Sequence, residues 1–334
     1  NNYLKFLIMK INSIFNIKSE IEFEKICFEI YDFQIRNNNV YKKYATSILQ
    51  NKYPSSIFEI PFLPIRFFKE KKILCDNINS EIIFKSSGTE GSKSIHYVAD
   101  VEIYKNSFIK NFESFYGDIS NYCILALLPS YMQQGSSSLI FMIDELINKS
   151  KHPKSGYFLN DHNKLSQTIN QLESTQQKII LFGVTYALLD FAKKYSQQLK
   201  RTIIIETGGM KGRRKEMIKS ELHKILSKGF GVSKIHSEYG MTELLSQAYS
   251  KGDGIFVTQD WMKILLRDPY DPLKIINTQN KTGAINIIDL ANVNSCAFIA
   301  TDDLGKIYDD QKFEIIGRID QADMRGCNLL YDDN

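Results

Sequence analysis

Three largely apolar runs without polar alternation constrain the fold of this chain more than any other feature. They span residues 122–128, 178–182 and 201–205, and each is followed by a polar turn and then by a segment with helical spacing of apolar residues. A run without polar alternation is typical of a strand buried on both faces. Strands that alternate with helices in this way predict a parallel sheet covered by helices. We therefore predict an α/β fold.

From residue 283 onward the pattern changes to short apolar runs separated by Asp, Asn and Gly turns, which is typical of a small β subdomain. The predicted organisation is a helical and extended segment over 1–80, an α/β core over 81–282, and a β subdomain with a tail over 283–334. The expected helices span 19–50 (with a polar turn at 37–39), 139–148, 185–195 and 213–228. The expected late strands span 285–288, 296–300 and 312–316.

The predicted helix over 213–228 has one apolar face. Its spacing places Ile218, Leu222, Ile225 and Leu226 on the buried side. Gly229 is a fitting residue for its C-terminal stop.

Composition and charge exclude several classes of function. A net charge of +4 over 334 residues gives no reason to expect nucleic acid as a partner, and the one basic cluster, 211–215, suits a solvated helix start. The five cysteines contain no C-x-x-C pair, so zinc and thioredoxin-type sites lack support, and the odd count fits a reducing cytoplasm. The apolar start lacks a cleavage site, and no stretch reaches the ~18 apolar residues of a transmembrane helix. We expect a cytoplasmic protein.

The segment 86–94 reads Ser-Ser-Gly-Thr-Glu-Gly-Ser-Lys-Ser directly after an apolar run. Glycines let backbone N–H groups turn inward, hydroxyls add short donors, and Lys93 adds a compact positive charge. These features predict a phosphate-binding loop, although the spacing matches neither a Walker A loop nor a G-x-G-x-x-G turn. A polar hairpin turn would explain the same residues without a ligand.

Three further polar segments carry candidate chemistry. In 237–243, Thr242 and Glu243 follow a glycine turn and suit Mg²⁺ near phosphates, although Thr242 could equally cap a helix. In 300–305, an Asp in a turn between two strands could bind ribose hydroxyls, or the segment could be an ordinary hairpin turn. The segment 317–320 closes the last expected strand.

Taken in chain order, the patterns S-S-G-T-x-G, Y-G-x-T-E, T-x-D-L-G and G-R-x-D resemble the adenylate-forming superfamily of acyl-CoA synthetases and luciferases. The run from 84 to 327 is most similar to bacterial acyl-protein synthetases of the LuxE type, through stretches such as SSGTEGSKSIHYV and IHSEYGMTELLSQAY. The resemblance implies a large adenylating domain with parallel sheets. It also implies the absence of the small C-terminal domain that carries a catalytic lysine in most of the superfamily.

The resemblance implies roles for single residues. Those that would hold the ATP phosphates are Ser86, Ser87, Gly88, Thr89, Gly91 and Lys93. Those that would flank adenine are Gly208, Gly209 and Tyr239, and those at the ribose are Asp303 and Arg318. Thr242 would contact the α-phosphate, and Glu243 would hold Mg²⁺. The charge of the missing lysine could come from Lys211, Arg213, Arg214 or Arg325.

The implied reaction is ATP- and Mg²⁺-dependent activation of a fatty acid to acyl-AMP, followed by transfer to a protein cysteine. Cys327 would accept the acyl group, with Arg325 lowering its pKa, unless it is only a partly buried residue of the tail. An acyl reductase or a carrier is the implied partner. Two alternatives stay open: an adenylating ligase that passes the acyl group to CoA, a carrier protein or a sugar amine, and a non-catalytic subunit that binds nucleotide or acyl groups.

Overall fold

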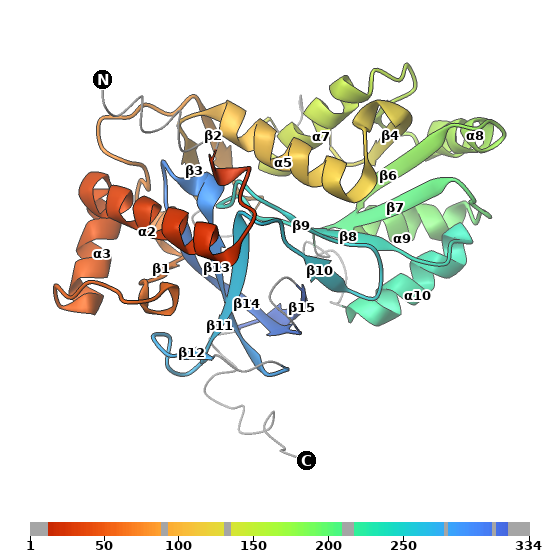
Figure 1. Ribbon diagram of the computed structural model, residues 1–334. Coiled ribbons are helices and arrows are strands. Elements are labelled where there is room, and N and C mark those ends of the chain that lie inside the picture. The colour runs from red at the N-terminus through yellow and green to blue at the C-terminus, as the bar shows by residue number, and fades with distance from the viewer. Residues whose placement is uncertain are drawn as a thin grey trace, which may run out of the picture. The chain divides into compact units, whose positions relative to one another are not determined.

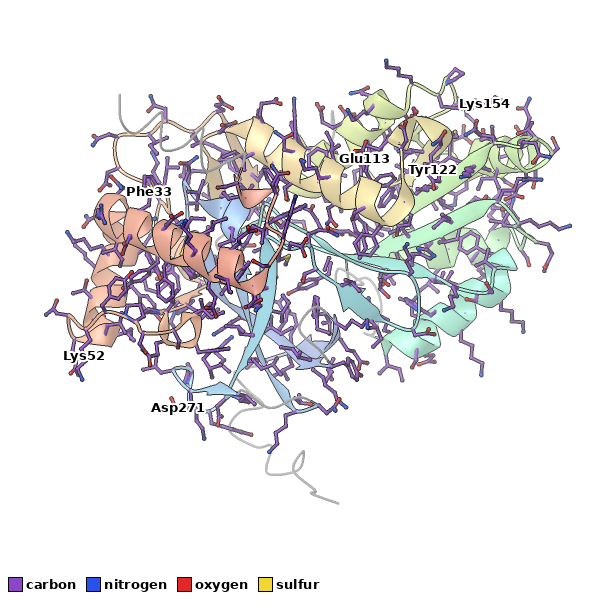
Figure 2. The ribbon with its side chains drawn as sticks, viewed as in Figure 1. Phe33, Lys52, Glu113, Tyr122, Lys154 and Asp271 are labelled. Carbon is purple, nitrogen blue, oxygen red and sulfur yellow. The ribbon has the colours of Figure 1, made fainter. Side chains whose placement is uncertain are left out.

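The computed structural model describes residues 13–87, 93–129, 135–208, 217–276, 280–308 and 312–319 (Figure 1). The chain divides into two compact units. We call Ser80–Val257 the central unit, and Asn1–Asn79 together with Thr258–Asn334 the terminal unit. Within both units, large apolar side chains such as Phe33 and Tyr122 are buried, whereas Lys52 and Asp271 are exposed (Figure 2).

The central unit is built on a largely parallel sheet, which confirms the predicted α/β fold. Its strand order is β10-β9-β8-β7-β6-β4-β5. The parallel strands are β4 (Tyr122–Leu127), β5 (Gly156–Tyr157), β6 (Lys178–Val184), β7 (Thr202–Thr207) and β8 (His236–Tyr239). The antiparallel strands β9 (Ala248–Ser250) and β10 (Ile255–Val257) follow at one side. All six residues of β4 are buried, as the continuous apolar run predicts.

Helices cover both faces of this sheet. They are α5 (Val101–Tyr116), α7 (Ser138–Ser150), α8 (His162–Glu173), α9 (Thr185–Lys194) and α10 (Lys219–Phe230), with a short turn of 3₁₀-helix, η2 (Ile119–Asn121). Figure 1 shows α5 and α7 on one face and α9 and α10 on the other. A separate hairpin, β2 (Ile82–Lys85) with β3 (Ile95–Val98), belongs to the same unit.

The predicted face of the helix over 213–228 is partly wrong. Residues 213–216 lie outside the described chain, and helix α10 begins at Lys219. Leu222 and Leu226 are buried, but Ile218 precedes the helix and is 70% exposed, and Ile225 is 42% exposed. The helix continues through Gly229 and ends at Gly231, whose φ of 66° suits glycine. Because the helix ends later, Phe230 belongs to it and is buried, so the buried face of the helix is formed by Leu222, Leu226 and Phe230.

The terminal unit combines an antiparallel sheet with the N-terminal helices. The sheet has the order β12-β11-β13-β14-β15, and its strands are β11 (Met262–Arg267), β12 (Ile275–Ile276), β13 (Thr282–Asp289), β14 (Phe298–Ile307) and β15 (Lys312–Arg318). The other elements are α2 (Glu20–Asn37), α3 (Asn39–Leu49), η1 (Ile57–Glu59), β1 (Leu63–Pro64), α4 (Phe67–Glu70) and η3 (Leu290–Asn292). Short strand β1 pairs with β14 in parallel.

Aromatic packing and buried amides join the two chain segments of the terminal unit. Phe298 is fully buried and stacks on Tyr41 with ring centroids 5.8 Å apart. Gln34 in α2 donates hydrogen bonds to the carbonyls of Asn292 and Val293. In the C-terminal segment of this unit the strands begin at Met262, before the change of sequence pattern at 283, because β11 pairs with β13.

The predicted turn over 300–305 is wrong, because these residues lie inside strand β14. The hydroxyl of Thr301 donates to the carbonyl of Ile285, so a polar residue that reads as a turn signal is satisfied within the sheet. The register between β14 and β15 shifts between Leu304 and Gly305, which lets the acidic residues sit in an irregular stretch of strand.

Candidate functional site

The base of the predicted phosphate loop is a hairpin in the central unit. Strands β2 and β3 pair up to Lys85 and Ile95, and the backbone N–H of Ser86 then donates to the carbonyl of Ser94 at 3.0 Å. The N–H of Ser94 returns a bond to Ser86 Oγ, also at 3.0 Å. The ends of the loop are therefore held together at its neck. Ser87 and Lys93 are exposed there, while Gly88, Thr89 and Gly91 lie outside the described residues.

A buried histidine connects this hairpin to the second predicted motif. His96 in β3 is fully buried, and its Nδ1 lies 2.8 Å from the carbonyl oxygen of Thr242. A carbonyl oxygen only accepts, so Nδ1 carries the hydrogen and donates it. His96 is not among the predicted site residues, because a lone histidine after a loop is more often structural than catalytic. No sequence pattern marks His96, and its buried position on a short strand becomes visible only in the structure.

The second motif leaves the sheet at the carboxyl end of β8. Tyr239 is the last residue of that strand, and the N–H of Leu244 closes a turn onto the carbonyl of Met241 at 3.1 Å. No helix begins at Thr242 in this described segment, so the alternative reading of Thr242 as a helix cap is wrong. Glu243 is 5% exposed. In parallel α/β sheets, ligands bind beside the carboxyl ends of the strands, which is where this turn lies.

Two of the residues predicted to flank adenine, Gly208 and Gly209, follow the neighbouring strand β7. Gly208 comes directly after Thr207 and has a φ of 69°, a conformation that strongly favours glycine. Its carbonyl accepts a hydrogen bond of 2.6 Å from the hydroxyl of Thr185, the first residue of α9. Gly209 lies outside the described residues. Because β7 and β8 are paired in parallel, Gly208 and Tyr239 lie at neighbouring positions where these two strands end.

A buried polar cluster lies beneath these strand ends. Glu206 is 3% exposed and accepts a 2.6 Å bond from Lys219, with His223 Nε2 at 3.6 Å. Burial alone would raise the pKa of Glu206, but the Lys219 ammonium and hydrogen bonds from His223 and Ser237 lower it to about 2. Glu238 is 7% exposed, and its burial, together with the negative charge of Glu206, raises its pKa to about 7. Sequence reasoning missed this cluster entirely.

In the terminal unit, Asp303 and Arg318 are direct cross-strand partners in β14 and β15. The Arg318 Nε lies 3.6 Å from Asp303 Oδ1, and Arg318 Nη2 lies 4.0 Å from Asp302 Oδ2. The Asp303 side chain is 14% exposed and its backbone N–H donates to Thr301 Oγ1. The structure thus brings together the two residues predicted at the ribose.

The described cysteines are poor nucleophiles. Cys27, Cys75, Cys123 and Cys296 are free, buried thiols. Burial raises the pKa of Cys75 to about 12 and that of Cys123 to about 11, and it raises the pKa values of Cys27 and Cys296 as well. Cys327 lies outside the described residues, as do Lys211, Arg213, Arg214 and Arg325.

Glu243 is the one residue predicted to hold Mg²⁺. The described part of the chain contains no group of three or more His, Cys, Asp or Glu side chains that could hold a metal. Magnesium on a nucleotide needs only one or two carboxylates, because water and phosphate oxygens fill its other positions. The single carboxylate of Glu243 fits this requirement.

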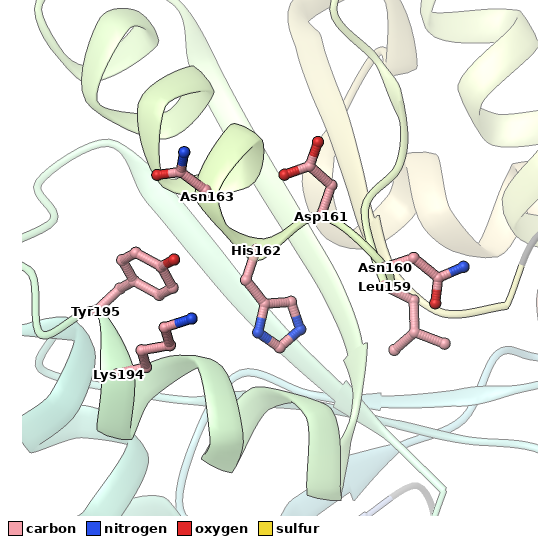
Figure 3. A pocket seen from close by; sticks show the side chains of 7 residues that line it. All are labelled: Leu159, Asn160, Asp161, His162, Asn163, Lys194 and Tyr195. Atoms are coloured by element: carbon pink, nitrogen blue, oxygen red, sulfur yellow. The ribbon is translucent and has the colours of Figure 1, made fainter.

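A shallow hollow of 420 Å³ lies elsewhere in the central unit (Figure 3). It lies between the start of α8, where Asp161 accepts a bond from the N–H of Lys164, and the end of α9. His162 packs edge-on against Phe191, and the polar lining includes Lys194 and Tyr195. None of the predicted site residues lines it.

Comparisons with known proteins agree with the motifs. The family described as acyl-protein synthetase, LuxE, matches residues 15–334. The chain belongs to the acyl-protein synthetase (LuxE) family. As a member, it is an AMP-forming acid–thiol ligase that activates a carboxylic acid by adenylation. A curated relative, the long-chain-fatty-acid–luciferin-component ligase of Aliivibrio fischeri, is 24% identical over 92% of this chain and 86% of its own length.

Solved structures show the same fold. A 2-hydroxyisobutyryl-CoA ligase in the postadenylation state, in complex with 2-HIB-AMP, matches with a TM-score of 0.64 and 11% identity over 90% of this chain and 68% of its own. An open conformation of a 2-hydroxyisobutyryl-CoA ligase matches with a TM-score of 0.61 and 12% identity over 88% of this chain and 73% of its own. In this acyl-protein synthetase, no helix among the described residues has the length and hydropathy needed to cross a bilayer.

Proposed function

We propose that this acyl-protein synthetase activates a long-chain fatty acid with ATP and transfers the acyl group to its own Cys327. The family match over residues 15–334 supports the adenylation step. The relative from Aliivibrio fischeri, whose name states a long-chain fatty acid ligase, supports the class of acid. An acyl reductase or carrier that receives the group, and a cytoplasmic location, are parts of the same proposal.

The chemistry has two displacements. A carboxylate oxygen of the acid attacks the α-phosphorus of ATP, a new P–O bond forms, and the bond to the β-phosphate oxygen breaks to release pyrophosphate. The Cys327 thiolate then attacks the acyl carbon, a C–S bond forms, and AMP leaves with the C–O bond electrons. The thiol proton passes to solvent before attack, since the thiolate is the nucleophile. The protein supplies positioning and neutralisation of charge.

The proposed roles are those that the resemblance to adenylate-forming enzymes implies. The residues that would grip the β- and γ-phosphates are Ser86, Ser87, Gly88, Thr89, Gly91 and Lys93. Thr242 would donate to the α-phosphate, and the buried Glu243 carboxylate would hold Mg²⁺. Gly208, Gly209 and Tyr239 would flank adenine. Asp303 would accept bonds from the ribose hydroxyls, with Arg318 holding its carboxylate in place.

The burial of the other thiols supports Cys327 as the acceptor. An acyl acceptor must reach the acyl carbon and must ionise near neutral pH. Cys27, Cys75, Cys123 and Cys296 meet neither condition, because all four are buried and burial raises their pKa values. Cys327 is the remaining cysteine of the five.

Single-turnover labelling with radioactive fatty acid, ATP and Mg²⁺ tests the proposal. We expect a hydroxylamine-labile label on the wild type, none on Cys327→Ser despite normal pyrophosphate release, and neither product from Lys93→Ala. Lys52→Ala, an exposed lysine of the terminal unit, is the matched control and should behave as wild type. Pyrophosphate without label in the wild type would show that CoA, a carrier protein or a sugar amine accepts the acyl group. Tight ATP binding without pyrophosphate from any acid would favour a non-catalytic subunit.

A further inference from the structure

Glu238 lies between two motifs of the central unit and contacts both. It is paired with Thr207 across β7 and β8, and Thr207 Oγ1 donates a hydrogen bond to Glu238 Oε2. Thr207 directly precedes Gly208. The other carboxyl oxygen reaches the next turn, because a Cβ atom added to Gly240 would stand 2.5 Å from Glu238 Oε1. One buried side chain therefore packs against the ends of both strands.

We propose that Glu238 is a positioning residue that fixes Gly208 and the Tyr239–Glu243 turn relative to each other, and that it does so in its neutral, protonated form. This inference rests on the proposed function, because those two segments are assigned there to adenine, the α-phosphate and Mg²⁺. Glu238 itself touches neither substrate nor metal in this assignment. Its role is to keep the spacing between groups that do.

The surroundings of Glu238 favour the neutral form. Glu206 on β7 is ionised and held by Lys219 of α10, which leaves the positive charge of that lysine already engaged. The other titratable groups that face Glu238 are the phenols of Tyr116 on α5 and Tyr249 on β9. On its own strand, His236 has its pKa lowered to about 4, by burial first and then by Lys251, Lys234 and His223, so it is uncharged near neutral pH.

Ionisation of Glu238 would place a second carboxylate beside Glu206 in a buried site. Like charges in a low-dielectric environment repel strongly, and burial already opposes the charged form. The hydrogen bond from Thr207 and the charge of Lys219 lower the pKa of Glu238, but burial and the charge of Glu206 outweigh them, and the pKa is raised to about 7. Proton loss would push the carboxyl away from Glu206, and it would also add negative charge beside the segments that are proposed to bind phosphate. We therefore expect ATP binding to weaken as the pH rises through 7.

A double-mutant cycle tests the contact with Gly240 without using activity. Gly240→Ala alone should lower the unfolding midpoint, since its Cβ would collide with Glu238 Oε1 and this buried carboxyl is held by its bond from Thr207. In the Glu238→Ala background the same change should cost much less, although the Gln247 side chain at 3.2 Å must still yield slightly. Additive costs in the cycle would overturn the contact. Thermal or urea unfolding supplies the measurement, and Glu113→Ala, an exposed residue of α5, is the matched background control.

A pH profile tests the role of the neutral form. For the wild type, we expect KM and Kd for ATP to rise about tenfold between pH 6 and pH 8, as one proton is lost from a group with a pKa near 7. Glu238→Gln keeps the shape and the bond from Thr207 but cannot ionise, so its Kd for ATP should stay flat across this range. Glu238→Ala should raise KM and Kd at every pH while changing kcat less. Glu113→Gln should follow the wild type.

The outcomes separate this inference from the proposed function. If the wild type shows acid-dependent pyrophosphate exchange but Glu238→Gln has the same pH profile as the wild type, the positioning role is wrong and adenylation stands. If the wild type shows no exchange with any fatty acid, the proposed function fails. The unfolding cycle would still decide whether Glu238 packs against Gly240.

Discussion

Arg267→Met tests whether a buried cation holds the sheet of the terminal unit together. Arg267 ends strand β11 and is 7% exposed. Its Nη1 donates to the carbonyl of Ile285 at 2.7 Å and to Asn286 Oδ1 at 2.8 Å, and its Nη2 donates to the carbonyl of Thr301 at 2.6 Å. These acceptors lie where the register between β13 and β14 shifts. The guanidinium therefore donates hydrogen bonds to polar groups at an irregular stretch of the two paired strands.

The size of the effect follows from what the substitution leaves behind. The carbonyl of Ile285 keeps its bond from Thr301 Oγ1, but Asn286 Oδ1 and the carbonyl of Thr301 each lose the arginine bond. A buried acceptor that loses its partner costs about 1–3 kcal/mol, so two of them cost about 2–6 kcal/mol. Methionine removes a buried charge, which offsets part of this cost. We expect the free energy of unfolding to fall by about 3 kcal/mol.

The assay uses the tryptophan that the chain provides. Trp261 is the single tryptophan, is 5% exposed, and packs edge-on against Phe15 with ring centroids 5.0 Å apart, so its fluorescence reports on the terminal unit. Urea unfolding of Arg267→Met should show a midpoint lowered by about 1 M, because a loss of about 3 kcal/mol is divided by a dependence of about 3 kcal/mol per M, the upper end of the range for small proteins. Arg36→Met is the matched control, because Arg36 is 75% exposed and pairs only loosely with Asp32 at 3.6 Å, and it should change stability by less than about 0.5 kcal/mol. Equal midpoints for the two variants would refute the reasoning.

Three shorter predictions concern single side chains. Thiol reagents should modify one cysteine rapidly in the native protein, and Cys327→Ser should abolish that reaction, because the four described thiols are buried. His96→Asn should retain more pyrophosphate exchange than His96→Phe, since an amide can still donate to the carbonyl of Thr242 and a phenyl ring cannot; equal losses would contradict a positioning role. Phe298→Ala should lower the free energy of unfolding by about 3–5 kcal/mol in urea titrations, because the ring is fully buried against Tyr41 and Phe62.

The parallel strands could be predicted from the sequence because their signal is local. Strand β4 is apolar throughout, and β6 and β7 each have an apolar middle without polar alternation, which is the pattern of a strand buried on both faces. Helix α10 was harder. Its face depends on where the helix ends, and Gly231 ends it instead of Gly229, because the cap forms where the chain turns and not at the first glycine available.

The polar cluster beneath the site could not be predicted because its members come from separate segments. Glu206 and Glu238 are 32 positions apart in sequence and become neighbours only through the pairing of β7 with β8. Lys219 and His223 join them because they stand one helical turn apart on α10. In the sequence each of these residues looks like an ordinary charged or polar residue at the end of an element. The motifs, in contrast, are short and contiguous, so their residue types alone indicate nucleotide chemistry.

The pKa shifts of His236 and Glu238 have opposite effects on how the free energy of unfolding depends on pH, so variants are needed to separate the two contributions. The pKa of Glu238 is raised from 4.5 to about 7, so its contribution to stability is present below pH 4.5 and is lost as the pH rises through 7. The pKa of His236 is lowered from 6.5 to about 4, so its contribution is present above pH 6.5 and is lost as the pH falls through 4. Each shift corresponds to about 3 kcal/mol, and between these limits the two slopes have opposite signs.

His236 and Glu238 lie two residues apart on strand β8. In the wild type their contributions to the pH dependence of stability should cancel, so together they should change the free energy of unfolding little between pH 4.5 and pH 6.5. His236→Gln removes one slope, so this variant should become more stable as the pH falls over that range. Glu238→Gln removes the other slope and should become less stable over the same range. Urea midpoints at four pH values measure both trends. Parallel curves for the two variants would show that the surroundings of these side chains do not shift their pKa values in opposite directions.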